Sequence, residues 1–237
     1  MPSSPVPLPL TNHLAGLVSP GISDYTAAAA EYIRKASGLT DGQKKAAQIV
    51  LSQCLATVLL TDLRSALGLP LPDAFAGERE VGGGLRSVNA DLSEMTTQDG
   101  LTLAVEIKPV HLAVGRAIWN RFGDIRTFAV NIHLKFPFAV VGGVMTIPSE
   151  ERKRSNDDTE WKSTTHLVEK AIQRFTRAGG RRTEADAPHL LEGIAVVVFD
   201  HKTGNILPAL PPHGTGLRWE EFVDSIAAAY RARFGPI

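Results

Sequence analysis

Large apolar residues occupy every second position along residues 101–108, where Leu, Leu, Val and Ile alternate with Thr, Ala, Glu and Lys. A period of two is typical of a β-strand that has one face in a hydrophobic core. The preceding segment, Leu85 to Thr97, is rich in Val, Leu, Met, Ser and Thr, and the dipeptide Asp99-Gly100 favours a two-residue hairpin turn because both positions need positive φ. We therefore expect a β-hairpin in which Glu106 and Lys108 share the polar face of the second strand.

The register of this hairpin determines which charged residues meet. If Asp99 and Gly100 form the turn, Asp91 lies directly opposite Lys108, and Glu106 lies one step along the diagonal. Residues that lie opposite each other point to the same side of the sheet, with their Cβ atoms about 5 Å apart. We therefore expect Asp91, Glu106 and Lys108 to converge on one face of the hairpin.

The same register creates one conflict, because it places Glu94 on the apolar side, opposite Val105. A one-residue slip in the pairing would send Asp91 away from Glu106. A β-bulge between Ser93 and Thr96 would remove the conflict.

Two helices are expected before the hairpin. The first runs through residues 27–36, and the second runs from Gln43 to Leu67 with Gly68 as its stop. The second helix has little polar surface, so it should be central to the fold. Residues 70–84 should form a loop that ends in three glycines. A flexible linker is one interpretation of these glycines, and close approach of the backbone to a phosphate is the other.

The segment after the hairpin fits two patterns. Residues 112–135 contain both a strand-like alternation and a helical stripe. We predict a helix, because residues 138–147 form an evident strand, and a strand parallel to the hairpin needs a helical crossover. The rest of the chain should form three further elements, namely an amphipathic helix from about Trp161 to Gly179, a buried strand over 192–199 and a closing helix over 219–234.

Composition indicates an ordinary globular protein. The 237 residues include 25 Lys plus Arg and 25 Asp plus Glu, so the overall charge does not demand a nucleic-acid partner. The single cysteine, Cys54, is expected to be a buried small hydrophobe in a reducing compartment. No apolar run reaches the roughly 18 residues that a membrane span needs, so no membrane partner is expected. We expect a proline-rich flexible arm over residues 1–20, one domain over 21–237, and a soluble cytoplasmic protein.

The predicted trio of charges has a clear chemical use. Two carboxylates a few ångströms apart repel each other unless a cation neutralises them, and oxygen ligands without Cys or His favour Mg²⁺ over Zn²⁺. An ion held by two carboxylates keeps sites open for water, which suits phosphodiester hydrolysis. Lys108 would then supply positive charge near the attacked phosphate.

Asp91, followed on the next strand by Glu106-Ile107-Lys108, resembles the active-site hairpin of the PD-(D/E)xK nuclease superfamily, which includes most type II restriction endonucleases. Ala90 stands where the name of the motif has proline. The resemblance implies that Asp91 and Glu106 bind Mg²⁺, that the main-chain carbonyl of Ile107 is a further ligand, and that Lys108 orients the nucleophile. An exposed hairpin face with a surface ion pair between Asp91 and Lys108 is the alternative interpretation.

The resemblance also implies an α/β fold with a restriction-endonuclease-like α-β-β-α-β core, in which helices flank a mixed central sheet. It implies a Mg²⁺-dependent endonuclease that cuts double-stranded DNA, of the type II restriction class, acting as a homodimer. Two alternatives stay open: a repair or phage-defence nuclease for ends, branches or modified DNA, and a noncatalytic domain that binds a partner. The sequence contains no nucleotide-binding fingerprint, so no nucleotide cofactor is expected.

Two groups of cations are candidates for DNA contact. The first group lies in a charged loop expected over residues 148–159, and the second lies on and after the amphipathic helix near residue 175. The first consists of Arg152, Lys153 and Arg154, and the second of Arg174, Arg177, Arg181 and Arg182. For the first group, the alternative is charge that simply faces solvent. For the second group, the alternative is that its cations interact favourably with the C-terminus of the helix.

Overall fold

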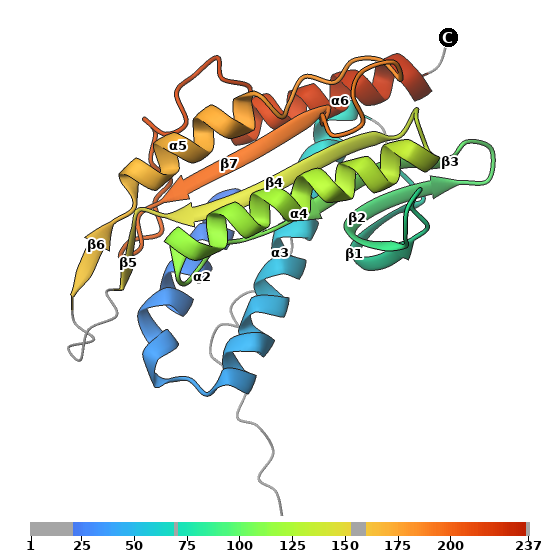
Figure 1. The fold of residues 1–237 in the computed structure, drawn as a ribbon. Coiled ribbons are helices and arrows are strands. Elements are labelled where there is room, and N and C mark those ends of the chain that lie inside the picture. Colours follow the sequence, from blue (N-terminus) through green and yellow to red (C-terminus); the bar gives the residue numbers. More distant parts are fainter. Residues whose placement is uncertain (1–20, 69–70, 153–159, 236–237) are drawn as a thin grey trace, which may run out of the picture.

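The computed structural model describes residues 21–68, 71–152 and 160–235. The predicted N-terminal arm therefore lies outside the described residues. Five strands form one mixed sheet in the order β1-β2-β3-β4-β7 (Figure 1). The strands are β1 (Ala74–Val81), β2 (Val88–Thr96), β3 (Gly100–Ile107), β4 (Val140–Pro148) and β7 (Gly193–Phe199). The strands β1, β2 and β3 are antiparallel neighbours, whereas β3, β4 and β7 are parallel.

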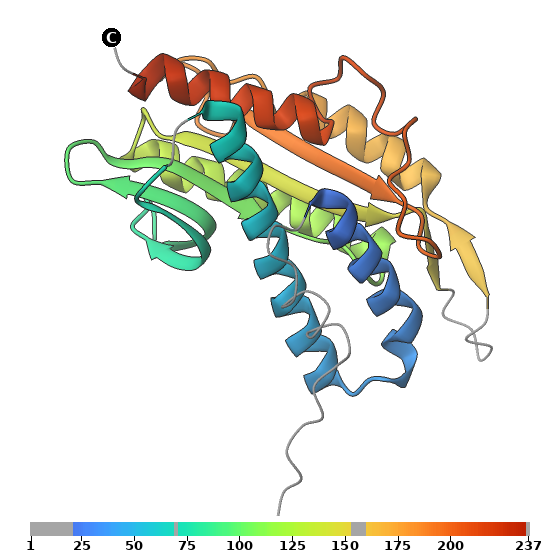
Figure 2. The same cartoon turned by 180° about the vertical axis from the view of Figure 1, so that it is seen from behind.

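Helices cover both faces of the sheet, and each face has its own apolar core. The helices α4 (Val114–Lys135) and α5 (Thr165–Thr176) pack on one face (Figure 1). The helices α2 (Ile22–Lys35), α3 (Asp41–Leu67) and α6 (Trp219–Phe234) pack on the other (Figure 2). The protein is thus an α/β protein whose mixed central sheet is flanked by helices, as the sequence predicts. Three short elements complete it: η1 (Ala36–Gly38), β5 (Glu150–Arg152) and β6 (Trp161–Ser163).

The central helix α3 begins and ends where its sequence signals lie. The Thr40 side chain accepts a hydrogen bond from the backbone N–H of Gln43, and Gly68 ends the helix with a φ of +64°. By length and composition, α3 is the one helix of the described residues that could cross a membrane, but the core helix of a soluble protein meets the same two criteria. Its packing against the sheet, α2 and α6 buries nine of its residues, among them Leu51, Leu55 and Leu59.

The hairpin of β2 and β3 has a longer turn and a different register from those predicted. Thr96 pairs with Gly100, which has a φ of +69°, so three residues form the turn. The register shifts between Glu94 and Met95, inside the interval in which a bulge was expected. Because Leu92 then pairs with Val105, the continuing register places Asp91 opposite Glu106 rather than opposite Lys108. The difference is two residues, so Asp91 keeps its predicted face.

Glu94 is buried, as the predicted conflict implied, but it lies opposite Leu103 rather than Val105. Its carboxylate accepts hydrogen bonds from the Thr102 hydroxyl at 2.7 Å and from the Tyr230 hydroxyl at 2.5 Å. A buried carboxylate is costly unless such donors satisfy it. The side chain is therefore accommodated by partners, one of which comes from α6.

The prediction of a loop over residues 70–84 is wrong for most of its length, because β1 occupies Ala74–Val81. A register shift between Ala76 and Arg79 interrupts the alternation that would have revealed this strand. The following glycines lie against α4: the backbone N–H of Gly84 donates to the carbonyl of Asn131, and a Cβ at Gly84 would lie 2.4 Å from the Cβ of Leu134. They allow close packing of backbone on a helix, which is neither of the two roles expected.

The predicted helix over 112–135 is confirmed as α4, and β4 runs parallel to β3 as expected. The closing helix is also confirmed. Trp161 belongs to β6 rather than to the amphipathic helix, which begins at Thr165. The segment expected as a charged loop contains the short strand β5, and Cys54 is only partly buried.

Candidate active site

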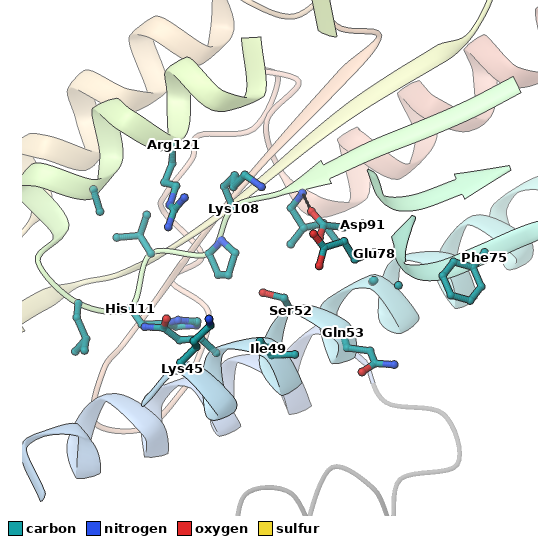
Figure 3. Close-up of a pocket in the computed structure, with 18 residues that line it drawn as sticks. Lys45, Ile49, Ser52, Gln53, Phe75, Glu78, Asp91, Lys108, His111 and Arg121 are labelled. Carbon is teal, nitrogen blue, oxygen red and sulfur yellow. Dashed lines mark hydrogen bonds between the residues drawn. The ribbon is translucent and has the colours of Figure 1, made fainter. Parts of the chain in front are cut away.

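A cavity of about 570 Å³ lies where the carboxyl end of β3 meets α3, β1 and α4 (Figure 3). Asp91 from β2 and Lys108 from the end of β3 line it, as do Glu78 from β1 and Arg121 from α4. A second hollow of about 490 Å³ shares Glu78, Lys108 and Arg121 with the first and is lined also by Glu106. The predicted hairpin residues therefore lie around two adjoining hollows.

The structure brings Asp91, Glu106 and Lys108 together. The ammonium of Lys108 forms an ion pair with the carboxylate of Glu106. The carboxylate of Asp91 accepts a hydrogen bond of 2.7 Å from the backbone N–H of Ile107. Glu106 is 7% exposed, and among the ion pairs of the described residues none joins Asp91 to Lys108. The alternative interpretation of an exposed surface ion pair between these two residues is therefore wrong.

Burial disturbs the protonation of both acids. The pKa of Glu106 is raised to about 7, chiefly by removal from water and also by the Asp91 carboxylate, while the Lys108 ammonium opposes the shift. Burial also raises the pKa of Asp91, against the effects of the Ile107 N–H and the Lys108 ammonium. The site thus holds two partly desolvated carboxylates, of which one is paired with the Lys108 ammonium, and additional positive charge would stabilise their ionised forms.

The available donors fit a hard divalent cation. The Oε2 atom of Glu106 is buried and has no hydrogen-bond partner among the described residues. Together with Asp91, it offers carboxylate oxygens, which Mg²⁺ prefers. No group of three or more His, Cys, Asp or Glu side chains in the described part of the chain is placed to hold a metal ion. Two carboxylates suffice for Mg²⁺, which usually keeps several waters. The role of the Ile107 carbonyl as a further ligand stays a prediction.

Two charged residues of the site were not placed by sequence reasoning. Glu78 lies close enough to raise the pKa of Asp91, but it belongs to β1, which was expected to be a loop. Arg121 is an exposed residue of α4 whose side chain points towards the cavity, with its guanidinium 3.3 Å from the Asp124 carboxylate (Figure 3). Its position depends on how α4 packs on the sheet, which the helical pattern alone does not encode.

The first group of proposed DNA-binding cations is only partly described. Lys153 and Arg154 lie outside the described residues. The Arg152 guanidinium donates to the carbonyl of Arg34 at 2.7 Å and lies 5.0 Å from the ring centroid of Trp161. Arg152 also lines a hollow of about 610 Å³ that His111 shares with the candidate cavity.

In the second group, Arg174, Arg177 and Arg182 are exposed, and the Arg174 guanidinium lies 4.2 Å from the ring centroid of Trp119. Arg181 differs from them: it is 3% exposed and forms an ion pair of 3.1 Å with the buried carboxylate of Glu192. A side chain engaged in this way has no surface to offer a DNA phosphate. The assignment of Arg181 to DNA binding is therefore corrected to a structural role.

The function of this site has to be argued from its own geometry and chemistry. Comparison of the chain with family models, with curated proteins and with solved structures finds no match.

Proposed function

We propose that this protein is a Mg²⁺-dependent endonuclease of the PD-(D/E)xK superfamily that hydrolyses phosphodiester bonds in double-stranded DNA, as type II restriction enzymes do. The observation that carries the proposal is the meeting of Asp91, Glu106 and Lys108 beside an open cavity, with a buried carboxylate oxygen of Glu106 left without a partner. Perturbed carboxylates of this kind cluster at functional sites.

The order of the elements supports this proposal. A helix, α3, precedes the hairpin of β2 and β3, and α4 then leads to β4, which is parallel to β3. This is the α-β-β-α-β series expected of a restriction-endonuclease-like core. The strand β1 extends the sheet beyond β2, and β7 extends it beyond β4.

Each residue of the trio has a distinct proposed role. Asp91 and Glu106 would hold Mg²⁺, which supplies polarisation of a phosphoryl oxygen and lowers the pKa of bound water. The Ile107 N–H holds the Asp91 carboxylate in place. Lys108, oriented by its ion pair with Glu106, stabilises the negative charge that develops on the phosphate and orients the attacking water. The resemblance implies products with 5′-phosphate and 3′-hydroxyl ends.

The proposed substrate needs further cations around the site. Arg121 lines the same cavity as Asp91 and Lys108, which suits contact with the phosphate backbone. The exposed Arg174, Arg177 and Arg182, together with Arg152, remain proposed contacts with more distant phosphates. Cutting both strands of a duplex favours a homodimer with two-fold symmetry.

The test is cleavage of mixed plasmid DNA in Mg²⁺ by the purified protein and by two single variants, Glu106→Ala and Lys108→Ala. Glu169→Ala and Lys170→Ala, which change the same residue types at exposed positions of α5, serve as matched controls. We expect discrete fragments from the parent and from both controls, and at least a hundredfold loss in the site variants, in line with removal of a catalytic charge.

An unchanged fragment pattern in the Glu106 and Lys108 variants would remove these residues from the mechanism. Smeared rather than discrete products would favour the end-directed repair or defence nuclease. A noncatalytic domain predicts no Mg²⁺ affinity at Asp91 and Glu106, and a calorimetric titration measures this directly.

A further inference from the structure

Two large apolar side chains are exposed inside the candidate cavity. Six large hydrophobic residues of the described chain are exposed, and of these Ile49, at 57%, and Phe75, at 43%, line the cavity. Single exposed hydrophobic residues are common on protein surfaces. Two of them lining a cavity that Asp91 and Lys108 also line form an apolar surface suited to part of a ligand.

The wall that α3 contributes combines apolar contact with hydrogen-bonding capacity. Ile49, Ser52 and Gln53 recur at a spacing of three and four residues, so they share one face of the helix. All three residues line the cavity, and Ser52 points from α3 towards Asp91 (Figure 3). Within the described residues, the side chains of Ser52 and Gln53 have no hydrogen-bond partner, so their hydroxyl and amide groups are free to bind a polar ligand edge.

The Phe75 ring is held at the end of this wall by a distortion of β1. Gly77 has a φ of +145° beside the register shift of the strand, and a Cβ there would lie 3.0 Å from Cε1 of Phe75. The Arg79 guanidinium lies 4.7 Å from the centroid of the ring. Bulges of this kind redirect side chains next to functional sites. An aromatic ring beside a guanidinium group is a surface on which nucleobases stack.

The opposite side of the cavity is cationic. Lys108 follows β3, and Arg121 projects from α4 across the space from Ser52 and Ile49 (Figure 3). The α3 wall therefore presents apolar and amide groups with the ammonium of Lys45 at one end, and the opposite side carries Lys108 and Arg121 beside the carboxylates of Glu78 and Asp91. A nucleic-acid strand has the matching division, with bases on one side and phosphates on the other.

We propose that the cavity binds an unpaired nucleotide next to the phosphate that is cut, with its phosphate against Lys108 and Arg121 and its base against Ile49, Gln53 and Phe75. The inference rests on the proposed nuclease function and specifies its substrate. Within a duplex, neighbouring base pairs cover both faces of each base, so an aromatic ring reaches only a base that has left the stack. In the double-stranded DNA of the proposed function, the site therefore takes a flipped base or a frayed end, and a single strand, whose bases are already unpaired, should bind to it more tightly than a perfect duplex.

The first measurement is the affinity for a fluorescently labelled single-stranded oligonucleotide and for the same sequence as a perfect duplex. Ca²⁺ replaces Mg²⁺, and a gel verifies that the strands stay intact. The test variant is Phe75→Leu, which keeps an apolar side chain but removes the ring, and Phe75→Ala is the second variant. Phe138→Leu and Phe138→Ala are the matched controls, because Phe138 is 57% exposed and does not line the cavity.

We expect the parent and the Phe138 variants to bind the single strand more tightly than the duplex. We expect the Phe75 variants to bind the single strand at least about fivefold more weakly, the low end of the effect of losing one base–aromatic stack. A 2-aminopurine base in the oligonucleotide should be quenched by the parent and less by the Phe75 variants. Equal affinities of the Phe75 and Phe138 variants, or no binding of the oligonucleotide by the parent, would overturn the inference.

Cleavage in Mg²⁺ distinguishes this inference from the function on which it rests. If the parent cleaves DNA, Glu106→Ala does not, and Phe75→Leu cleaves and binds like Phe138→Leu, the nuclease proposal stands and the base site is refuted. If binding depends on Phe75 but the parent cleaves no DNA, the base site stands and the nuclease proposal is refuted.

Discussion

The carboxylate of Asp91 on β2 accepts a hydrogen bond of 2.7 Å from the backbone N–H of Ile107 on β3. Ile107 lies between Glu106 and Lys108 in the sequence, so this bond fixes one acid of the site to the backbone that carries the other two charged residues. A backbone donor cannot change rotamer as a side chain can. The hairpin itself therefore sets the distance between Asp91 and Glu106.

Asp91→Asn and Asp91→Ala should separate the structural role of this bond from the charge. The amide oxygen of asparagine can still accept from Ile107, so Asp91→Asn should unfold at a denaturant concentration no lower than the parent. Asp91→Ala leaves the Ile107 N–H without its partner and should lose about 1–2 kcal/mol in the free energy of unfolding. Urea denaturation measures both. Equal destabilisation by the two substitutions would contradict the role assigned to the hydrogen bond.

Glu106 should make the metal-free protein less stable as the pH rises. Its pKa is about 7 in the folded protein, above the ordinary value of 4.5, so the folded state binds the proton more tightly than the unfolded state. Between these two values the folded state carries more protons, and the free energy of unfolding falls as the pH increases. Glu106→Gln removes this dependence. Urea denaturation in EDTA across this range should show a smaller decline in the variant, and parallel curves would argue against the raised pKa.

Protons and Mg²⁺ should compete for the same carboxylates. Below pH 7 Glu106 is largely protonated, and a metal ligand has to lose its proton. The dissociation constant for Mg²⁺ should therefore fall by up to about tenfold for each pH unit on approaching pH 7 and level off above it. Calorimetric titration at several pH values measures this. An affinity that does not change between about pH 5.5 and 8 would exclude Glu106 as a ligand.

Arg181→Ala and Arg182→Ala should differ sharply although the residues are neighbours. Arg181 is buried against Glu192, which also pairs with Arg233 at 2.7 Å, whereas Arg182 is exposed. Loss of Arg181 should cost about 3 kcal/mol in the free energy of unfolding, because a partner of a buried charge is removed. Loss of Arg182 should change it by less than about 0.5 kcal/mol. Similar stabilities of the two variants would show that the Arg181 pair is not structural.

DNA affinity provides the second difference between these two variants. At a temperature where both are folded, Arg181→Ala should bind an oligonucleotide duplex as the parent does. Arg182→Ala should bind it more weakly, with a smaller dependence on salt concentration, if it contacts a phosphate. If Arg181→Ala weakened duplex binding and Arg182→Ala did not, Arg181 rather than Arg182 would be the residue that contacts DNA.

Local sequence patterns were sufficient to predict most of the helices and strands. The capping and stop signals of α3 predicted that helix. The periodicity of α4 was ambiguous, but the need for a crossover before a strand parallel to β3 predicted a helix there. Alternation placed Asp91, Glu106 and Lys108 on one face, and an error of two residues in the register left that face unchanged, because side chains alternate with a period of two. The strand β1 was missed because its bulge at Gly77 breaks the alternation.

By itself, the sequence determined the ends of α3, which strand positions share a face, and which three charged residues meet. Only the tertiary structure decided that Arg181 is buried, that Glu94 is satisfied by a hydroxyl from α6, and that α3 and α4 enclose the site with Ile49 and Arg121 on opposite walls. The first set depends on periodicity and caps, which operate over a few neighbouring residues. The second depends on contacts between segments far apart in the chain, and these form only when the helices pack on the sheet.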